Sequence, residues 1–283
     1  MNLWLLPSPS QIRALDLPGL DTLCQRADLL AAIEPGLDAA LRDAFGWSAN
    51  PPWAVLLASD VADTDSAWLL ADLIHLKAEV SSVRVMALAV DTDPDHPDLP
   101  LLMEALRPWL ADESIEIAAV QGGRLLLRCP LALGDPDAAA PDALLGSDLR
   151  GLLPADLRWQ RRINELQIVL TQQSCNEARV ARQLPPWNCL WFWGHGVNAT
   201  VPPPATTRLA SRDPLLLALA RHAGMQLIDI EAESAEPTLR DVRDPRQLQQ
   251  LWQAGIRPGQ ALLRCADGSG WRVRPSPWWK FWR

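Results

Sequence analysis

Short apolar runs and helical spacings alternate along the first part of the chain. The run at 2–6 predicts an opening strand, and apolar residues at every third or fourth position over 21–41 favour two short helices. Runs at 53–59 and 83–90 are typical of buried strands, whereas the spacing over 66–79 predicts a helix between them. Strands that alternate with helices predict an α/β fold.

The alternation continues to a segment without a long period. A helix is expected over 99–110, followed by a hairpin of two apolar strands around Gly122-Gly123. The segment 135–150 is rich in proline, alanine and aspartate, so a soft domain boundary is expected there. The prediction is an N-terminal α/β region at 1–150 and a C-terminal α/β region at 151–283, with one continuous domain as the alternative.

Helical spacing returns at Asp156 and leads into an aromatic strand. Pro185-Pro186 ends a second, short helix, and the apolar run NCLWFW at 188–193 predicts a buried strand. A parallel crossover is expected from this strand to a later one. The elements expected after it are a helix at 213–222, a strand at 225–230, a helix at 246–254 and a hairpin formed by ALLRCA and WRVR.

Polar residues stand at the joints of the stretch 159–196, and this combination predicts a binding crevice. An arginine there offers parallel donors that suit phosphate or carboxylate, and His195 would lie at the strand end where α/β sheets bind ligands. In the structural alternative, Asn176 caps a helix and Asn188 satisfies backbone groups. The candidate ligand-binding residues are Asn164, Glu165, Asn176, Arg179, Asn188, Trp193 and His195; no catalytic residue is assigned.

Two aspartate clusters are weak candidates for metal ligands. Asp60 follows the run at 53–59, at the kind of position where α/β folds place metal or phosphate chemistry, although aspartates there also cap helices. The loop at 91–98 contains Asp91, Asp93 and Asp95, but it fails the calcium-loop template, which requires glycine at position 96 and glutamate at position 102. Asp72 and His75 favour a structural hydrogen bond. No metal and no cofactor are therefore expected.

Composition narrows the functional classes. A net charge of −8 disfavours general nucleic-acid binding, and five scattered cysteines without a CxxC pair are typical of reduced cytosolic thiols. The chain has neither a signal peptide nor a transmembrane run, so a cytoplasmic protein is expected. Fourteen tryptophans suggest core packing or a homo-oligomer formed through tryptophan-rich surfaces, and the tail SPWWKFWR is expected to fold onto the domain or a partner subunit.

The run WQRRINELQIVLTQQSCNEARVARQLPPWNCLWFWGHG, with AWLLADLIHLKAEVSSVRVMAL, DPLLLALARHAGMQLID and WWKFWR, resembles the RpfE-type bacterial regulatory proteins. That family is distantly similar to archaeal-type cofactor-independent phosphoglycerate mutases of the alkaline-phosphatase-like superfamily. The resemblance implies a three-layer α/β scaffold with a mainly parallel sheet, and the final pair of strands adds a C-terminal β-hairpin.

The sequence departs from those mutases in its potential metal ligands. The mutases need two metal ions, a serine nucleophile and clustered aspartates and histidines, whereas this chain has four histidines and no such cluster after His222. The leading hypothesis is a pseudoenzyme, a regulatory protein that binds a small anionic ligand or a protein partner. The alternative is a metal-dependent phosphatase or mutase-like enzyme that uses Asp60, or the loop at 91–98, with His195.

Overall fold

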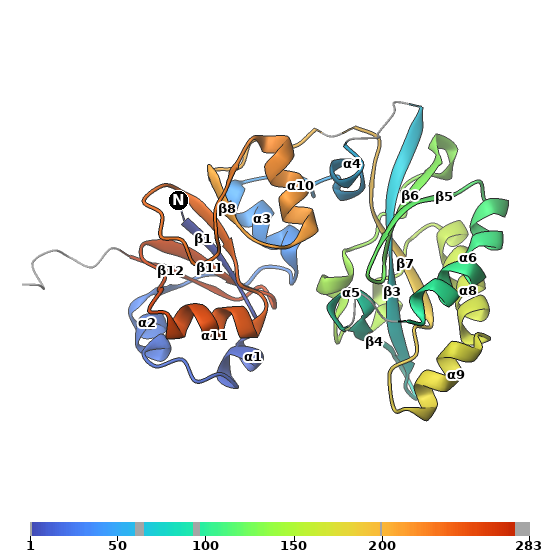
Figure 1. Ribbon diagram of the computed structural model, residues 1–283, viewed down its shortest axis with the longest axis horizontal. Helices are drawn as coiled ribbons and strands as arrows, with labels where there is room; N and C mark the ends of the chain where they lie inside the picture. The colour runs from blue at the N-terminus through green and yellow to red at the C-terminus, as the bar shows by residue number, and fades with distance from the viewer. Residues whose placement is uncertain (1, 60–64, 93–96, 199, 275–283) are drawn as a thin grey trace, which may run out of the picture. The chain divides into compact units, whose positions relative to one another are not determined.

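The computed structural model describes residues 2–59, 65–92, 97–198 and 200–274 and divides the chain into two compact units (Figure 1). The first unit comprises Met1–Asn50 and Val201–Arg283, and the second comprises Pro51–Thr200. The divisions therefore fall near 50 and 200 and differ from the boundary expected at 135–150. That segment belongs to the second unit, where Leu144 and Leu149 are buried and Trp191 Nε1 donates to Ala139 O at 2.9 Å.

The first unit contains the mainly parallel sheet. The strand order is β2-β12-β11-β1-β10-β8-β9; β11, β1, β10, β8 and β9 run parallel, and the antiparallel β11–β12 pair is the expected C-terminal hairpin. The elements are β1 (Asn2–Leu6), α1 (Pro9–Arg13), α2 (Leu20–Arg26), β2 (Asp28–Leu29), α3 (Leu37–Phe45), β8 (Arg208–Ala210), α10 (Pro214–Ala223), β9 (Gln226–Leu227), β10 (Thr238–Asp241), α11 (Pro245–Gln253), β11 (Ala261–Cys265) and β12 (Gly270–Val273).

Helices cover both faces of this sheet. Because side chains alternate along a strand, Trp4 and Leu263 share one face, and they form a core cluster with Leu251 and Trp252 of α11. Arg264 points to the opposite face, where its guanidinium donates to Asp43 Oδ2 of α3 at 2.7 Å. The first unit is thus an α/β structure, the class that the sequence predicted, whereas the mainly parallel sheet expected of the whole scaffold is found in this unit and not in the second, whose strands pair antiparallel.

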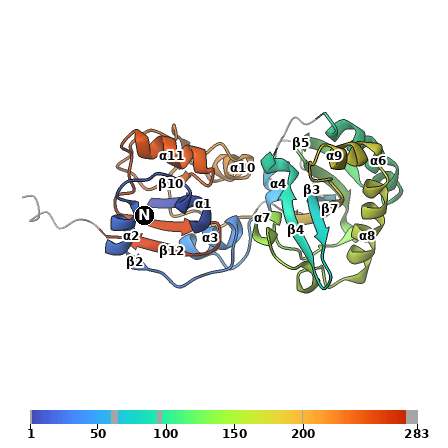
Figure 2. The ribbon, with the colours of Figure 1, turned by 90° about the horizontal axis from the view of Figure 1, so that it is seen from below.

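The second unit is built around a long central strand. β3 pairs antiparallel with β6, β4 and β7, and β5 pairs antiparallel with β6 (Figures 1 and 2). The elements are α4 (Trp53–Leu57), β3 (Ser66–Ala78), β4 (Val83–Leu88), α5 (Ala89–Thr92), α6 (Leu99–Asp112), β5 (Glu116–Gln121), β6 (Arg124–Pro130), the 3-10 turns Leu131–Leu133 and Leu149–Gly151, α7 (Pro141–Leu144), α8 (Leu157–Thr171), α9 (Ser174–Ala181) and β7 (Cys189–Gly196).

Three predictions about this unit were wrong. The helix expected over 66–79 is β3, whose first nine residues are all buried, so its continuous apolar run carries no strand alternation. The strand expected at 53–59 is the short helix α4, because five apolar residues are too few to show a period. The crossover expected from the aromatic strand is absent, since β7 and β9 belong to different sheets.

None of the helices in the described residues is both long and apolar enough to span a bilayer. The tail beyond residue 274, in which SPWWKFWR was expected to fold onto the domain or a partner, lies outside the described residues.

Candidate functional site

Two of the three asparagines in the stretch 159–196, Asn176 and Asn188, bind the backbone of the second unit. Asn176, which is 3% exposed, donates from Nδ2 to Leu170 O and Trp187 O at 2.8 and 2.9 Å, and its Oδ1 accepts from Trp187 N at 2.8 Å. Asn188 holds Leu76 in the same way, accepting from its N–H at 2.8 Å and donating to its carbonyl at 2.9 Å. Asn176 therefore does not cap α9. Each of the two asparagine side chains supplies hydrogen bonds to backbone N–H and C=O groups, which need partners where they are buried.

Arg179 is likewise engaged inside the unit. Its side chain is 4% exposed, and it donates to Pro185 O at 2.8 Å and to Asp98 Oδ2 at 3.2 Å while lying over the Trp187 ring. Asp98 precedes α6 and also accepts from Arg182 at 3.3 Å. The Asp98 carboxylate thus already binds the Arg179 guanidinium, which is the donor group expected to bind an external anion.

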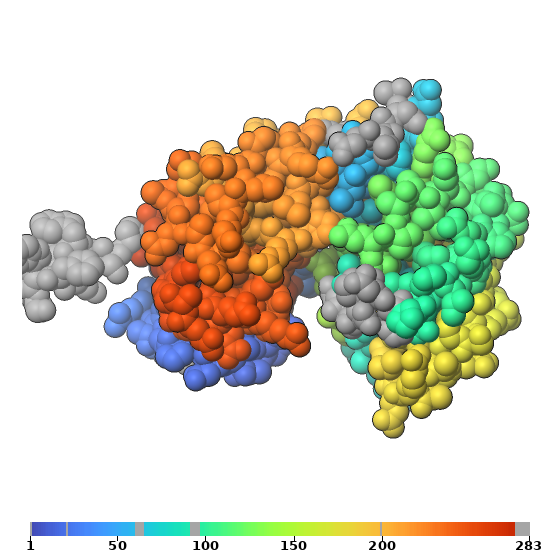
Figure 3. All heavy atoms as spheres, in the orientation of Figure 1, coloured from blue at the N-terminus to red at the C-terminus, as the bar shows by residue number. Residues whose placement is uncertain are grey.

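Asn164 and Glu165 lie on α8, away from these contacts. Asn164 is exposed and lines a shallow depression of 430 Å³ on the outer face of the helix. Glu165 accepts from Arg161 Nε at 2.6 Å and from Trp109 Nε1 at 3.1 Å, and these two hydrogen bonds lower the pKa of its carboxyl. Atoms of α8 and α9, coloured yellow, form part of the second unit's surface in Figure 3.

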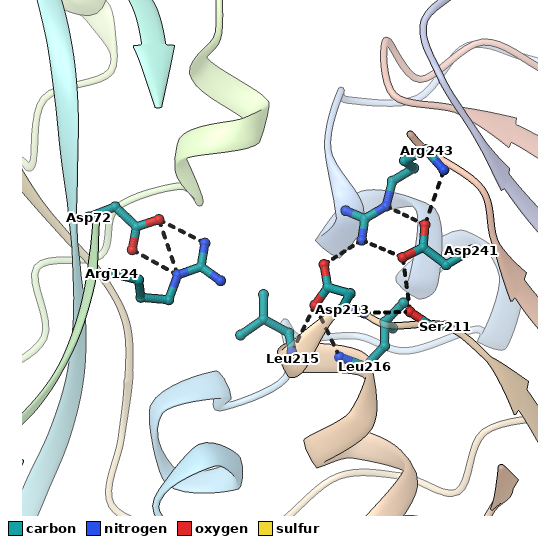
Figure 4. A network of polar contacts seen from close by, with 8 residues as sticks. All are labelled: Asp72, Arg124, Ser211, Asp213, Leu215, Leu216, Asp241 and Arg243. Atoms are coloured by element: carbon teal, nitrogen blue, oxygen red, sulfur yellow. Dashed lines mark hydrogen bonds and ion pairs between the residues drawn. The ribbon is translucent and has the colours of Figure 1, made fainter. Parts of the chain in front are cut away.

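Trp193 belongs to a buried polar cluster on the sheet. Its Nε1 donates to Asp72 Oδ1 at 3.0 Å. Arg124 donates to the same carboxylate, with Nη2 to Oδ2 at 2.7 Å, as Figure 4 shows. The Arg124 guanidinium also lies 5.0 Å from the centre of the Trp193 ring. Asp72 is fully buried, so the two donors compensate its charge. The expected Asp72–His75 hydrogen bond is replaced by separate contacts, because His75 bonds Pro186 O through Nδ1 at 2.9 Å.

His195 is the candidate ligand-binding residue whose ring has a nitrogen without a hydrogen-bond partner among the described residues. Its Nδ1 lies 3.5 Å from Asp135 Oδ2, and this contact lowers the pKa of the Asp135 carboxyl. Its Nε2 is buried and has no hydrogen-bond partner among the described residues. The flanking glycines are needed locally: Gly194 has a φ of 65°, and a Cβ on Gly196 would lie 2.7 Å from Val55 Cγ2. Because β7 pairs antiparallel with β3, His195 is not at the carboxyl edge of a parallel sheet.

The carboxyl edge of the parallel sheet, in the first unit, holds a different polar cluster (Figure 4). Arg243 donates to Asp213 Oδ2 at 2.6 Å and to both oxygens of Asp241 at 2.8 and 3.0 Å. Ser211 Oγ donates to Asp241 at 3.0 Å, and Asp213 caps α10 through the N–H groups of Leu215 and Leu216. Burial alone raises the pKa of Asp241, but the charge and hydrogen bonds of Arg243 hold it below its ordinary value.

This cluster was missed by the sequence reasoning. Its members come from two segments about 30 residues apart, 211–213 and 241–243, which only the parallel pairing of β8 with β10 brings together. The available signal was the Asp213-Pro214 pair, typical of a helix start, a few residues after the apolar pair Leu209-Ala210. A parallel sheet with Asp241 at the end of a strand would then have suggested the edge.

The aspartates proposed as metal ligands lie largely outside the described residues. Asp60, Asp93 and Asp95 lie outside the described residues, and for Asp91 only the backbone, within α5, is described. Within the described ranges, histidine, cysteine, aspartate and glutamate side chains form no group of three that could hold a metal ion.

Comparisons with known proteins give a distant structural likeness only. No family model and no curated protein matches the sequence. Similar solved structures include the PH0037 protein from Pyrococcus horikoshii, at 11% identity and a TM-score of 0.42, covering 93% of this chain and 81% of the other. A cofactor-independent phosphoglycerate mutase from Thermoplasma acidophilum has 14% identity and a TM-score of 0.39, covering 96% and 89%. No residue role is transferred at these values.

Proposed function

We propose that the protein is a cytoplasmic regulatory protein of the RpfE type, which binds a small anionic ligand or a protein partner and does not turn over phosphate esters. The observation that supports this proposal is the position of Arg243 between Asp213 and Asp241. In open α/β sheets the carboxyl ends of the strands are where catalysis is usually placed. Here two carboxylates at that edge already accept hydrogen bonds from a guanidinium.

The chemistry of this edge favours binding over phosphoryl transfer. Two carboxylates could hold a divalent cation, but an arginine between them supplies the opposite charge and fills their acceptor positions. The only hydroxyl in the cluster, Ser211 Oγ, donates to Asp241, whose carboxylate also accepts from Arg243. Arg243 keeps the pKa of this carboxyl below its ordinary value, and a weakly basic carboxylate is a poor general base for activating the hydroxyl against a phosphate ester. The five cysteines, none of them in a disulfide, fit a reducing compartment.

The proposal keeps a ligand-binding role for the stretch 159–196, but for fewer of its residues. Asn176, Arg179 and Asn188 have their polar groups occupied by the protein, so the residue of that stretch best suited to meet a ligand is His195, through Nε2. A small rearrangement of the loop around its two glycines would be required, since Nε2 is buried.

The test is an assay of the full chain for p-nitrophenyl phosphate hydrolysis and phosphoglycerate interconversion, with manganese, magnesium or zinc. We expect no turnover above buffer and no stoichiometric binding of these metals by calorimetry. Metal-dependent turnover that disappears in Asp60→Ala or His195→Ala would establish the alternative, a metal-dependent phosphatase or mutase-like enzyme. The control is Asn164→Ala, which changes an exposed residue of the same unit.

A further inference from the structure

The first unit has a second polar site, at the opposite edge of its sheet. A pocket of 440 Å³ opens where β1 and β10 begin, and it is lined by residues that include Asn2, Trp4, Thr238, Arg240 and Arg257. The strands pair in register there, with Trp4 opposite Arg240. The pocket therefore lies on the sheet face that α11 covers, next to the end of that helix.

Arg240 is an unusual residue for the middle of a buried strand. It is 5% exposed, and its guanidinium lies 5.2 Å from the centre of the Trp4 ring. Nη2 donates to Ala232 O at 2.6 Å, whereas Nη1 is buried and has no hydrogen-bond partner among the described residues. Burial lowers the pKa of Arg240, and Asp229 acts on it only through its charge, in the opposite direction.

A buried guanidinium without an ion-pair partner is costly, and such groups are rarely left so in folded proteins. Among the described residues of this unit, the other buried arginine, Arg264, differs in this respect, since it forms an ion pair with Asp43 at 2.7 Å. A water molecule could satisfy the Nη1 hydrogen bond but not the charge. An anion would satisfy both.

The other residues that line the pocket suit a small polar molecule that carries an anionic group. Arg257 lies over the Trp252 ring and donates from Nη1 to Trp252 O and Ile256 O. Glu233, at the exposed rim, is the acidic side chain of the lining and repels an anion, but the two arginines of the lining, Arg240 and Arg257, outnumber it. Asn2 and Thr238 are bonded to each other, with Thr238 N donating to Asn2 Oδ1 at 3.0 Å, and thus form a fixed wall.

We infer that this pocket binds a small oxyanion, a phosphate or carboxylate group, through the Nη1 group of the buried Arg240. The inference rests on the proposed function in one respect, because it supplies a site and a chemical class for its ligand. Its failure would leave open whether phosphate esters are turned over, which the turnover assay decides separately.

The experiment compares phosphate, acetate and chloride, at equal ionic strength, as probes of the full chain by thermal denaturation and calorimetry. We expect phosphate or acetate to raise the melting temperature of the wild type relative to chloride. Whichever anion acts identifies the preferred group. Arg240→Met should weaken its binding at least about tenfold, because a charge-assisted hydrogen bond is lost.

A second readout separates ligand binding from a structural role. In chloride, Arg240→Met should melt at or above the wild-type temperature, since an apolar side chain there relieves an uncompensated buried charge. Arg240→Lys should fold but bind the anion more weakly, because the ammonium lacks the planar fork. Arg26→Met, at an exposed arginine of α2 outside the pocket, is the charge-matched control and should behave as the wild type.

Three results would overturn the inference. The first is a wild type that responds to neither anion. The second is an Arg240→Met protein that binds as tightly as the wild type, since the anion would then bind elsewhere. The third is an Arg240→Met protein that melts several degrees lower in chloride, because the arginine would then stabilise the fold without a ligand.

Discussion

Asn176 binds the backbone of Trp187 with both of its polar groups, accepting from the N–H and donating to the carbonyl. The contact ties α9 to the segment that leads into β7, across the break made by Pro185-Pro186. One of the residues proposed from sequence to bind a ligand therefore positions the strand that carries Trp193 and His195.

We predict that Asn176→Ala lowers the free energy of unfolding by about 2 to 4 kcal/mol, because it leaves Leu170 O and both polar groups of Trp187 without their partner in a buried position. Urea denaturation of the variant measures the loss. Asn164→Ala, on the exposed face of α8, is the control and should change stability by less than about 0.5 kcal/mol. Equal effects of the two substitutions would contradict the structural role.

The ion pair of Arg179 with Asp98 supports a second prediction. Arg179→Met should destabilise the protein by about 3 to 5 kcal/mol, since it removes one partner of a buried pair, whereas Arg182→Met, at a half-exposed side chain, should cost less than about 1 kcal/mol. Combining Arg179→Met with Asp98→Asn should cost less than the sum of the two single changes. Strict additivity in denaturant unfolding would argue against the pair.

Arg243→Met should reverse the pH dependence of stability that Asp241 contributes. In the wild type the pKa of Asp241 is held below its ordinary value of 3.8, so its contribution is present above pH 3.8 and is lost as the pH falls through the folded value. Without Arg243, burial raises this pKa, and stability should fall as the pH rises from about 4 to 7. Melting temperatures across this range test the sign, and a variant curve parallel to that of the wild type would refute it.

His75 should make the protein less stable in mild acid. Burial lowers its pKa below the ordinary 6.5, although the hydrogen bond to Pro186 O acts in the opposite direction. The unfolded chain then takes up a proton before the folded one does, so stability is complete above pH 6.5 and declines as the pH falls from 6.5 toward the lower folded value. His75→Gln should flatten this part of the stability curve, and an NMR titration of the wild-type ring should give the lowered pKa directly.

Thiol reactivity should single out Cys24. Burial raises the pKa of Cys129 to about 11 and that of Cys265 to about 12, and it also raises the pKa values of Cys175 and Cys189. Cys24 is the cysteine of intermediate exposure. Because the thiolate is the reactive form, one thiol should react rapidly with Ellman's reagent in the native protein. Cys24→Ser should remove the rapid phase of the reaction. A second thiol that reacts rapidly would contradict the burial of the other four cysteines.

The sequence predicted elements whose boundaries are marked by local chemistry. The helix at 99–110, the hairpin around Gly122-Gly123 and the C-terminal hairpin are present, since turn glycines and a full helical period specify them without distant contacts. The interpretation of 66–79 failed because burial on both faces of β3 removes the alternation by which a strand is recognised. The pairing that assigns β7 and β9 to separate sheets depends on residues far apart in sequence.

The sequence singled out polar residues such as Asn176 and Asn188, but it did not indicate the partners that the structure gives them. Asn188 was offered two roles from sequence, and the structure shows the backbone one, with Leu76 as the partner. Arg240 had a local signal, a charged residue within the short run TLRD, but only the pairing of β10 with β1 and β8 shows that it is buried. Whether a charged side chain in a strand is buried depends on which strands lie beside it, and a single sequence does not show this pairing.

The division of the chain also has a consequence for the order in which the protein folds. During synthesis, β1 leaves the ribosome long before its two neighbours, because β10 and β11 are translated only after residue 237. The sheet of the second unit is complete in sequence at Gly196, so that unit can fold while the opening strand still waits, apolar and unpaired, for its partners. The first unit therefore has the higher contact order and should be the slower to form. Strand 2–6 is the segment most in need of protection from aggregation until β10 and β11 have been translated.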